Sequence, residues 1–327
     1  MQNPQGSRDF ARIVGFPQAS LSLGSVFPGE PMAPRPLPLS HMLLALAVVA
    51  VWGTNFVVIR AGLDHLPPLL FATLRFALAF FPAVFFLKRP PVPVKQLAAF
   101  GLLIGAGQFG LLYSAIDGHI TPGLASLVVQ TQVFFTILLS VRFTGERVQP
   151  AQWLALLMAA AGVGVIAAFT DGSATPLGLL MILGAAASWS GGNLVAARGG
   201  KVNMLAYVVW ASGFAILPLF LLSLAVEGWP AIRDGVVNAS LGTWGAVAWQ
   251  SVGNTMFGYG AWSWLLARHP AATVTPSALL VPVFGIGSSV LLLGESLPFW
   301  KIAACGLVIG GLAVNLLAPR LVRAVRP

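Results

Sequence analysis

The stretch TGERVQPAQWLALLMAAAGVGVI, residues 144–166, has a close counterpart in LGESLPFWKIAACGLVIGGLAVN, residues 293–315. Each stretch places a Gly-Glu pair ahead of an apolar run rich in alanine, glycine and branched residues. Self-similarity of this kind is typical of a duplicated structural unit. The sequence therefore predicts two copies of one fold, residues 42–170 and residues 171–319. Further pairs recur at nearly the same separation of roughly 150 residues: Phe109-Gly110 with Phe257-Gly258, and Val133-Phe134 with Val283-Phe284.

The composition is that of a membrane protein. Of 327 residues, 57% are hydrophobic and only 8% are charged, against roughly a quarter charged in soluble proteins. Apolar runs of about 20 residues recur along the chain, and a helix of that length crosses a hydrocarbon layer about 30 Å thick. The predicted spans are 42–62, 67–88, 96–117, 121–142, 150–170, 175–196, 203–226, 239–266, 271–292 and 298–319.

The runs do not alternate polar and apolar residues, so they predict helices rather than the strands of a membrane barrel. The predicted fold is an all-α membrane protein with ten transmembrane helices in two five-helix repeats. Because five is odd, the second repeat begins on the opposite side of the membrane, and the two copies are inverted. Inverted repeats are typical of secondary transporters, whose site lies between the repeats near the midplane and whose mechanism is alternating access.

The basic residues lie at the ends of the predicted spans. The net charge is +9 and the isoelectric point is near 10.8, but this placement argues against nucleic-acid binding and follows the positive-inside rule. Arg60, Arg233 and Lys301 fall on one side of the membrane, and Arg75 falls inside a span. The other Lys and Arg residues fall on the side that holds both termini, so both termini are predicted to be cytoplasmic.

Two segments lie outside the predicted spans. Residues 1–41 are rich in proline and lack an apolar run long enough for a signal peptide, so they are predicted to be a disordered cytoplasmic tail. Residues 320–327 are predicted to be a basic cytoplasmic tail. Met32 lies just ahead of the first span, which leaves open whether residues 1–31 belong to the native protein. Cys305 is the only cysteine, so no disulfide or cysteine metal cluster forms within the chain, and no cofactor is expected.

A carboxamide recurs inside the first span of each copy. VWGTN contains Trp52 and Asn55, and SWSGGN contains Trp189 and Asn193. Spacings of three and four residues place the Trp and the Asn on one helical face in each copy. Because the copies are inverted, the two Asn side chains are predicted to be symmetric about the midplane. They either join neighbouring helices by hydrogen bonds or line a cavity.

Arg75 breaks the repeat. It lies in LLFATLRFALAF, roughly eight residues or about 12 Å inside the outer end of the second span. Alignment of the copies through Pro82 and Pro218 places Ala211 at the equivalent position of the second copy, so the repeated fold does not require an arginine. An arginine inside a membrane costs about 2.5 kcal/mol or more and marks a functional site by default. Two interpretations stay open: Arg75 binds a substrate carboxylate, or it snorkels to the outer surface and anchors its helix.

Other polar and aromatic side chains within the spans are further candidates. When the two copies are aligned, Gln108, Gln130 and Gln132 correspond to apolar residues of the second copy. Gln130 and Gln132 are two residues apart and point about 200° apart on a helix, so at most one faces a shared cavity. Trp210 and Tyr259 are candidates for lining a substrate path, although aromatic residues at helical spacing more often pack or anchor.

The acidic and histidine side chains lie near the ends of the spans. Glu146 and Glu295 each precede a span and are expected to cap the helix that follows. All four histidines lie near span ends, so no proton relay through the membrane is visible. Proton coupling stays open, with Asp117 and His119 the nearest candidate carriers.

The motifs together resemble the EamA family of the drug/metabolite transporter superfamily and, within it, the bacterial exporters of O-acetylserine and cysteine. The resemblance covers residues 42–319 and rests on VWGTNFVVIRAGLDHLPPLLFATLRF, AGQFGLLYSAI, GLASLVVQTQVFFTILL and VTPSALLVPVFGIGSSVLLLGE. It implies ten helices in two inverted repeats, a bacterial inner membrane location and export of small metabolites. The positions to which it draws attention are Trp52, Gly53, Asn55, Arg75, Phe76, Gln130 and Leu279–Val283.

Export of a small zwitterionic amino-acid metabolite by alternating access is the leading functional hypothesis, with cysteine or O-acetylserine as the first substrate. Arg75 would face the substrate carboxylate, and carboxamides such as Asn55 and Gln130 would accept hydrogen bonds from the ammonium group. The alternative is broader efflux of drugs or nucleosides. An intramembrane enzyme is a remote alternative, because the chain lacks HExxH, GxSxG and paired carboxylates within a span. A passive scaffold is equally remote, because the inverted repeat argues against it.

Overall fold

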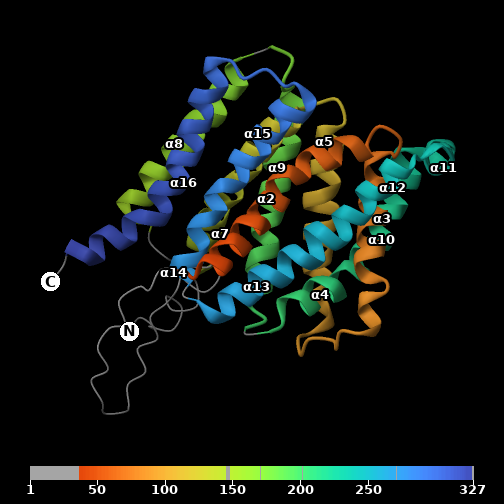
Figure 1. Ribbon diagram of the computed structural model, residues 1–327, viewed down its shortest axis with the longest axis horizontal. Helices are drawn as coiled ribbons and strands as arrows, with labels where there is room; N and C mark the ends of the chain where they lie inside the picture. Colours follow the sequence, from red (N-terminus) through yellow and green to blue (C-terminus); the bar gives the residue numbers. More distant parts are fainter. Residues whose placement is uncertain (1–36, 145–147, 170, 201, 270, 326–327) are drawn as a thin grey trace.

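Helices make up the regular structure of the protein. The computed structural model describes residues 37–144, 148–169, 171–200, 202–269 and 271–325 (Figure 1). Within these ranges the chain forms helices and loops, with a single bridge between Ile120 and Ala174 and no strand. The prediction of an all-helical chain is confirmed. Most of the predicted N-terminal tail lies outside the described residues, and residues 39–41 belong to the first helix, so the prediction of a tail was wrong there.

In the first half of the chain, proline opens several helices, because its missing N–H is not needed in the first turn. Two of the long helices change type along their length. The elements are α2 (Leu39–Gly62), α3 (Pro68–Phe80), α4 (Val94–Leu102) continuing through η2 (Leu103–Gly110) and α5 (Leu111–Ile116), α6 (Pro122–Val128) continuing through η3 (Val129–Thr131) and α7 (Gln132–Thr144), and α8 (Pro150–Ala168).

In the second half, the helix α11 lies between α10 and the long helical stretch that begins with α12. The elements of this half are α9 (Pro176–Ala197), α10 (Met204–Val226), α11 (Gly228–Asn238), α12 (Leu241–Ala248) continuing through η4 (Trp249–Phe257) and α13 (Gly258–Arg268), α14 (Ala271–Val274), η5 (Thr275–Leu280), α15 (Val281–Leu293) and α16 (Phe299–Val325). The last helix, α16, continues to Val325, so the predicted basic tail of residues 320–327 is helical through residue 325.

Nine helices of the described chain are long and apolar enough to cross a membrane. They match nine of the predicted spans to within a few residues. The exception is the predicted span 239–266, where the chain is helical from Leu241 to Arg268. Polar side chains interrupt the apolar character of this stretch: Gln250, Ser251, Asn254 and Thr255 all lie in η4.

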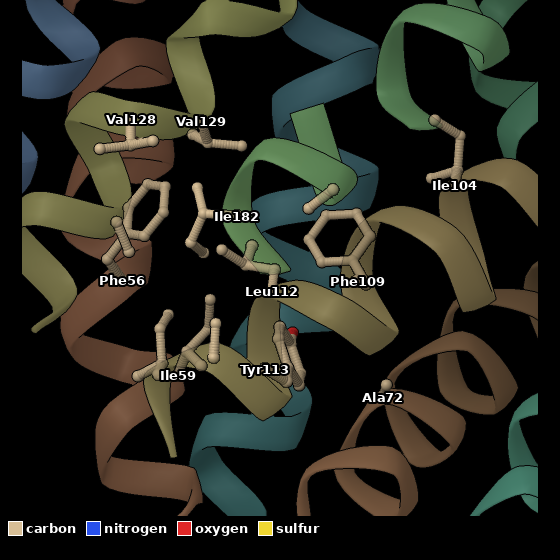
Figure 2. Packing of buried hydrophobic residues seen from close by; sticks show 14 of the residues in the cluster. Phe56, Ile59, Ala72, Ile104, Phe109, Leu112, Tyr113, Val128, Val129 and Ile182 are labelled. Atoms are coloured by element: carbon tan, nitrogen blue, oxygen red, sulfur yellow. The ribbon is translucent and has the colours of Figure 1, made fainter. Parts of the chain in front are cut away.

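The closest helix pairs join the two halves of the chain. They are α8 with α16, α3 with α10, and α2 with α15 (Figure 1). Buried apolar side chains fill the space between the helices, and Phe56, Leu112, Val128 and Ile182 meet there from four different helices (Figure 2). Because lipid is as apolar as these side chains, close van der Waals packing rather than the hydrophobic effect holds such helices together.

Glu227, directly after α10, caps the first turn of α3. Its carboxylate accepts hydrogen bonds from the backbone N–H groups of Leu69 and Leu70, at 2.5 and 3.2 Å, and from the hydroxyl of Ser223 at 2.5 Å. The negative charge thus lies at the positive end of the helix dipole. Burial raises the pKa of Glu227 above its ordinary value, and these hydrogen bonds offset only part of the rise. The second half of the chain thereby holds the start of α3.

Glu295, directly after α15, makes a similar contact with the first half. Its Oε1 accepts a hydrogen bond from the backbone N–H of Gly123, at 3.1 Å, in the first turn of α6. The expectation that Glu295 caps the helix that follows it was therefore wrong, because the folded chain brings it to the start of a different helix. Glu146, its predicted counterpart, lies outside the described residues.

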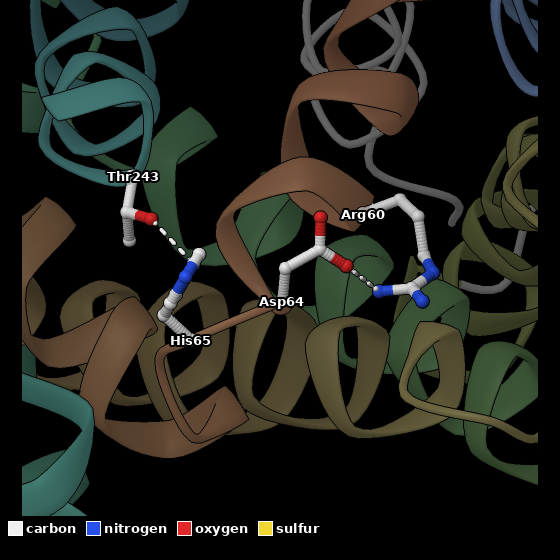
Figure 3. A network of polar contacts seen from close by, with 4 residues as sticks. All are labelled: Arg60, Asp64, His65 and Thr243. Atoms are coloured by element: carbon white, nitrogen blue, oxygen red, sulfur yellow. Dashed lines mark hydrogen bonds and ion pairs between the residues drawn. The ribbon is translucent and has the colours of Figure 1, made fainter. Parts of the chain in front are cut away.

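The end of the bundle that carries α11 is polar. Arg60 and Asp64 form an exposed ion pair at 2.8 Å, and a ring nitrogen of His65 lies 2.9 Å from the hydroxyl of Thr243 (Figure 3). Exposed pairs of this kind contribute little to stability. A hollow with a volume of about 360 Å³ opens beside them, lined by Leu63–Pro68, Asp117, Ala231, Asp234, Gly235 and Asn238.

We expect Gly53→Ala to destabilise the folded protein. A Cβ at Gly53 would overlap the carbonyl oxygen of Val281 and the side chain of Phe284, because α2 and α15 lie in close contact there. Overpacking costs about 1–3 kcal/mol, so the unfolding temperature of the purified protein in detergent should fall. Gly287→Ala is the control, because a Cβ at this position of α15 meets no atom within 4 Å. Equal unfolding temperatures for the two variants would contradict the close contact.

Candidate functional site

Two stretches of π-helix interrupt the α-helical bundle. They are η2, which ends at Gly110, and η4, which ends at Phe257, so each ends within a pair that the sequence comparison aligned. In a π-helix the backbone hydrogen bond spans five residues instead of four, and such segments are rare and often lie at functional sites. We therefore take the region between η2 and η4 as the candidate site.

Arg75, in α3, contacts both π-helical elements. Only 1% of it is exposed, and its two terminal nitrogens donate hydrogen bonds to the hydroxyls of Tyr113 and Thr255, both at 3.3 Å. Its guanidinium carbon lies 3.5 Å from the centre of the Phe109 ring and 5.2 Å from that of Phe76. Phe109 belongs to η2 and Thr255 to η4. The interpretation in which Arg75 snorkels to the surface was therefore wrong.

The hydroxyl groups near Arg75 are themselves hydrogen-bonded. Tyr113 donates to Oε1 of Gln250 at 2.9 Å, and Thr255 donates to the backbone carbonyl of Gln250 at 3.0 Å. The hydroxyl of Ser251 donates to the backbone carbonyl of Arg75 at 2.9 Å. These five residues, which we call the Arg75 network, join α3, α5 and η4. The network therefore connects the first half of the chain to the second.

The charge of Arg75 has no carboxylate partner in the described ranges, where its contacts are neutral hydroxyls and aromatic rings. Two buried donors of the network, Nε of Arg75 and Nε2 of Gln250, make no hydrogen bond. Leaving a buried donor without a partner costs about 1–3 kcal/mol. A fixed positive charge with vacant donors beside it favours an anion, and a carboxylate or phosphate oxygen accepts such bonds well.

Aromatic rings cover the neighbouring face of η4. The indole N–H of Trp52, in α2, donates to the backbone carbonyl of Asn254 at 3.2 Å. The Trp52 ring lies 5.9 Å from the ring of Tyr259 and 5.3 Å from that of Trp262. Asn254 is the sequence neighbour of Thr255, a member of the Arg75 network. This aromatic cluster of Trp52, Tyr259 and Trp262 therefore adjoins the Arg75 network.

The two repeated asparagines have different surroundings. Nδ2 of Asn193 donates to Oε1 of Gln132 at 3.2 Å and so joins α9 to α7. Asn55 is 4% exposed, and its Oδ1 is buried without a hydrogen bond. Asn193 is therefore a link between helices, whereas Asn55 keeps a vacant acceptor one turn along α2 from Trp52.

The remaining predicted site residues are spread over the bundle. Gln108 and Gln130 are buried in η2 and η3. The indole N–H of Trp210 donates to the backbone carbonyl of Leu87 at 2.9 Å, which joins α10 to the segment after α3. The structure thus brings Arg75 and the Trp52 cluster together at η4, whereas Asn193 and Trp210 hold helices elsewhere. No group of three or more His, Cys, Asp or Glu that could hold a metal occurs in the described ranges.

Sequence reasoning missed four members of the network, which are Tyr113, Gln250, Ser251 and Thr255. A signal for Gln250 was present, because it lies four residues before Asn254 in the least apolar of the predicted spans. Tyr113 carried no such signal, since a tyrosine near the end of a span usually marks the membrane interface.

Comparisons with known proteins agree with this architecture. The sequence profile of the EamA-like transporter family matches residues 39–168 and 176–317. The chain belongs to the EamA-like transporter family. It is 41% identical to a probable amino-acid metabolite efflux pump of Salmonella typhimurium, over 86% of this chain and 97% of the relative. The protein of that name in Escherichia coli is 38% identical, over 87% of this chain and 97% of the relative.

More distant relatives share the fold of this EamA protein. A probable terminal-alkyne amino-acid exporter of Streptantibioticus cattleyicolor is 26% identical over 84% of the chain and 93% of its own length. A solved crystal structure superposes with a TM-score of 0.55 at 22% identity, covering 86% of this chain and 98% of the other. The protein is thus a multi-pass transporter of the bacterial inner membrane and not an enzyme.

We expect Tyr113→Phe to destabilise this transporter. The change leaves Oε1 of Gln250 without a donor and one terminal nitrogen of Arg75 without an acceptor, at a cost of about 1–3 kcal/mol. The unfolding temperature in detergent should fall accordingly. The matched control is Tyr207→Phe, because the buried hydroxyl of Tyr207 makes no hydrogen bond and its removal leaves no partner behind. A Tyr113→Phe protein as stable as the wild type would contradict the network.

Proposed function

We propose that this protein exports small amino-acid metabolites across the bacterial inner membrane, with cysteine and O-acetylserine as the first candidate substrates. The two relatives at about 40% identity that are named probable amino-acid metabolite efflux pumps support this substrate class. The observation that carries the proposal is the buried charge of Arg75, which has neutral partners and no carboxylate among the described residues. The substrate carboxylate would supply the missing negative charge.

The substrate ammonium group would bind beside the aromatic cluster that adjoins the Arg75 network. Oδ1 of Asn55 is a buried acceptor without a donor, and an ammonium group donates three hydrogen bonds. The rings of Trp52 and Tyr259 offer faces that attract a cation. Gln108 and Gln130 would complete the lining of the substrate path, and Asn193 and Trp210 would hold the helices that surround it.

Transport would proceed by alternating access between two inverted repeats, residues 42–170 and 171–319. The helix pairs that join the two halves support this division, as do the two separate segments matched by the family profile. The helical stretch Leu241–Arg268 would be the tenth transmembrane helix, and both termini would be cytoplasmic. The polar side chains of η4 would then lie within the bilayer, where Arg75 and the substrate contact them.

Broader efflux of drugs or other metabolites is the second candidate function. The aromatic cluster of Trp52, Tyr259 and Trp262 favours it, because aromatic ring faces accommodate flat apolar molecules. Counterflow in proteoliposomes, with a panel of amino acids, nucleosides and cationic dyes outside, separates the two functions. Exchange that is confined to molecules with a free carboxylate supports amino-acid export, and exchange of the dyes supports the broader function.

We expect Arg75→Ala to lower counterflow of cysteine or O-acetylserine in proteoliposomes by tenfold or more, since one charge-assisted hydrogen bond is worth about 1.5–3 kcal/mol. Arg60→Ala is the control, because Arg60 is an exposed arginine whose contact is an ion pair with Asp64, and it should retain transport. Transport at the wild-type rate by a folded Arg75→Ala protein would show that Arg75 does not bind the substrate.

A further inference from the structure

The side chains of Arg75 and Gln250 both form hydrogen bonds with the hydroxyl group of Tyr113. Tyr113 accepts a hydrogen bond from Arg75 at 3.3 Å and donates one to Oε1 of Gln250 at 2.9 Å. The side chains of Arg75 and Gln250 therefore lie on either side of the same phenol oxygen. Each of them also keeps one vacant donor, Nε of Arg75 and Nε2 of Gln250. Two vacant donors and one positive charge are thus gathered in one small volume.

The side chain of Gln250 has a donor that a purely structural network does not require. Gln250 uses its carbonyl oxygen to accept from Tyr113, and its backbone carbonyl accepts from Thr255. Its amide nitrogen contributes nothing to this network, although it is fully buried at 0% exposure. A glutamate would accept from Tyr113 equally well and would also neutralise Arg75. The chain instead has a neutral side chain that adds a donor next to an unbalanced cation.

We propose that Gln250 is a specificity-determining residue, which binds the carboxylate of the substrate together with Arg75. This inference rests on the proposed export of amino-acid metabolites. Nε of Arg75 and Nε2 of Gln250 donate to the two carboxylate oxygens, and the guanidinium charge balances the carboxylate charge. Substrates without a carboxylate leave both donors vacant and the cation unbalanced, so the site rejects them.

The two donors come from different halves of the chain. Arg75 lies in α3 and Gln250 in η4, so a bound carboxylate bridges the halves at the site. Both side chains are almost fully buried in this conformation. The carboxylate reaches the two donors when α3 and η4 move apart, and its binding draws them together again.

The test compares Gln250→Glu with the wild type in proteoliposomes loaded with L-cysteine. Glutamate keeps an acceptor for Tyr113, removes the vacant donor and places a negative charge beside Arg75. Gln152→Glu is the matched control, because Gln152 lies in the capping box at the start of α8, where glutamate serves equally well. Unfolding temperatures of all three purified proteins report whether each one folds.

We expect Gln250→Glu to be folded and to lower counterflow of external L-cysteine and O-acetyl-L-serine by tenfold or more, while Gln152→Glu matches the wild type. Counterflow at the wild-type level by Gln250→Glu would overturn the inference. In the wild type itself, cysteamine, which is cysteine without its carboxylate, should compete at least tenfold less well than L-cysteine. Equal competition by the two compounds would also overturn the inference, and this comparison needs no variant.

Failure of the inference is distinguishable from failure of the proposed function. If the wild type exchanges L-cysteine or O-acetyl-L-serine but Gln250→Glu is unaffected, only the role of Gln250 is refuted. If the wild type exchanges no carboxylate-bearing metabolite at all, the proposed function and the role of Gln250 are both refuted.

Discussion

The buried guanidinium of Arg75 is the interaction on which the rest of the site depends. A cation inside a bilayer is costly unless polar groups or aromatic ring faces surround it, and here Tyr113 and the two π-helical segments supply them. Phe109 from η2 stacks on the guanidinium, and Thr255 from η4 accepts a hydrogen bond from it. The polar side chains of η4 follow from the same requirement. The charge thus explains why the helical stretch Leu241–Arg268 is less apolar than the nine helices that are apolar enough to cross a membrane.

Hydropathy predicted most of the helices, because span length and apolar composition are local properties of the sequence. The stretch around η4 is not among the helices that are apolar enough to cross a membrane, since its polar side chains make contacts with other helices. The predicted partner of Glu295 was wrong for a related reason. A carboxylate at the end of a helix caps whichever helix start lies beside it in the folded chain, and sequence neighbours do not reveal that α6 is the one.

Broken symmetry identified Arg75, and symmetry drew attention to the two asparagines without showing that only Asn55 would keep a vacant acceptor. The partners of Arg75 could not be predicted in the same way. Residues five apart, such as Gln250 and Thr255, point about 140° apart on an α-helix. In η4 the hydroxyl of Thr255 nevertheless donates to the backbone carbonyl of Gln250, because in a π-helix the residue five positions further on lies over that carbonyl. No pattern of polar residues in the sequence predicts this switch from α-helix to π-helix.

The carboxylate caps have a consequence for synthesis of the protein. The first turn of α3 receives its cap from Glu227, which is 158 residues further along the chain, and α6 receives its cap from Glu295, 172 residues further along. When the ribosome has completed these two helices, their terminal N–H groups still depend on water or lipid headgroups. The first half therefore enters the membrane with unfinished helix ends. Translation of the second half supplies both carboxylates, so the last part of the chain to be made completes the first.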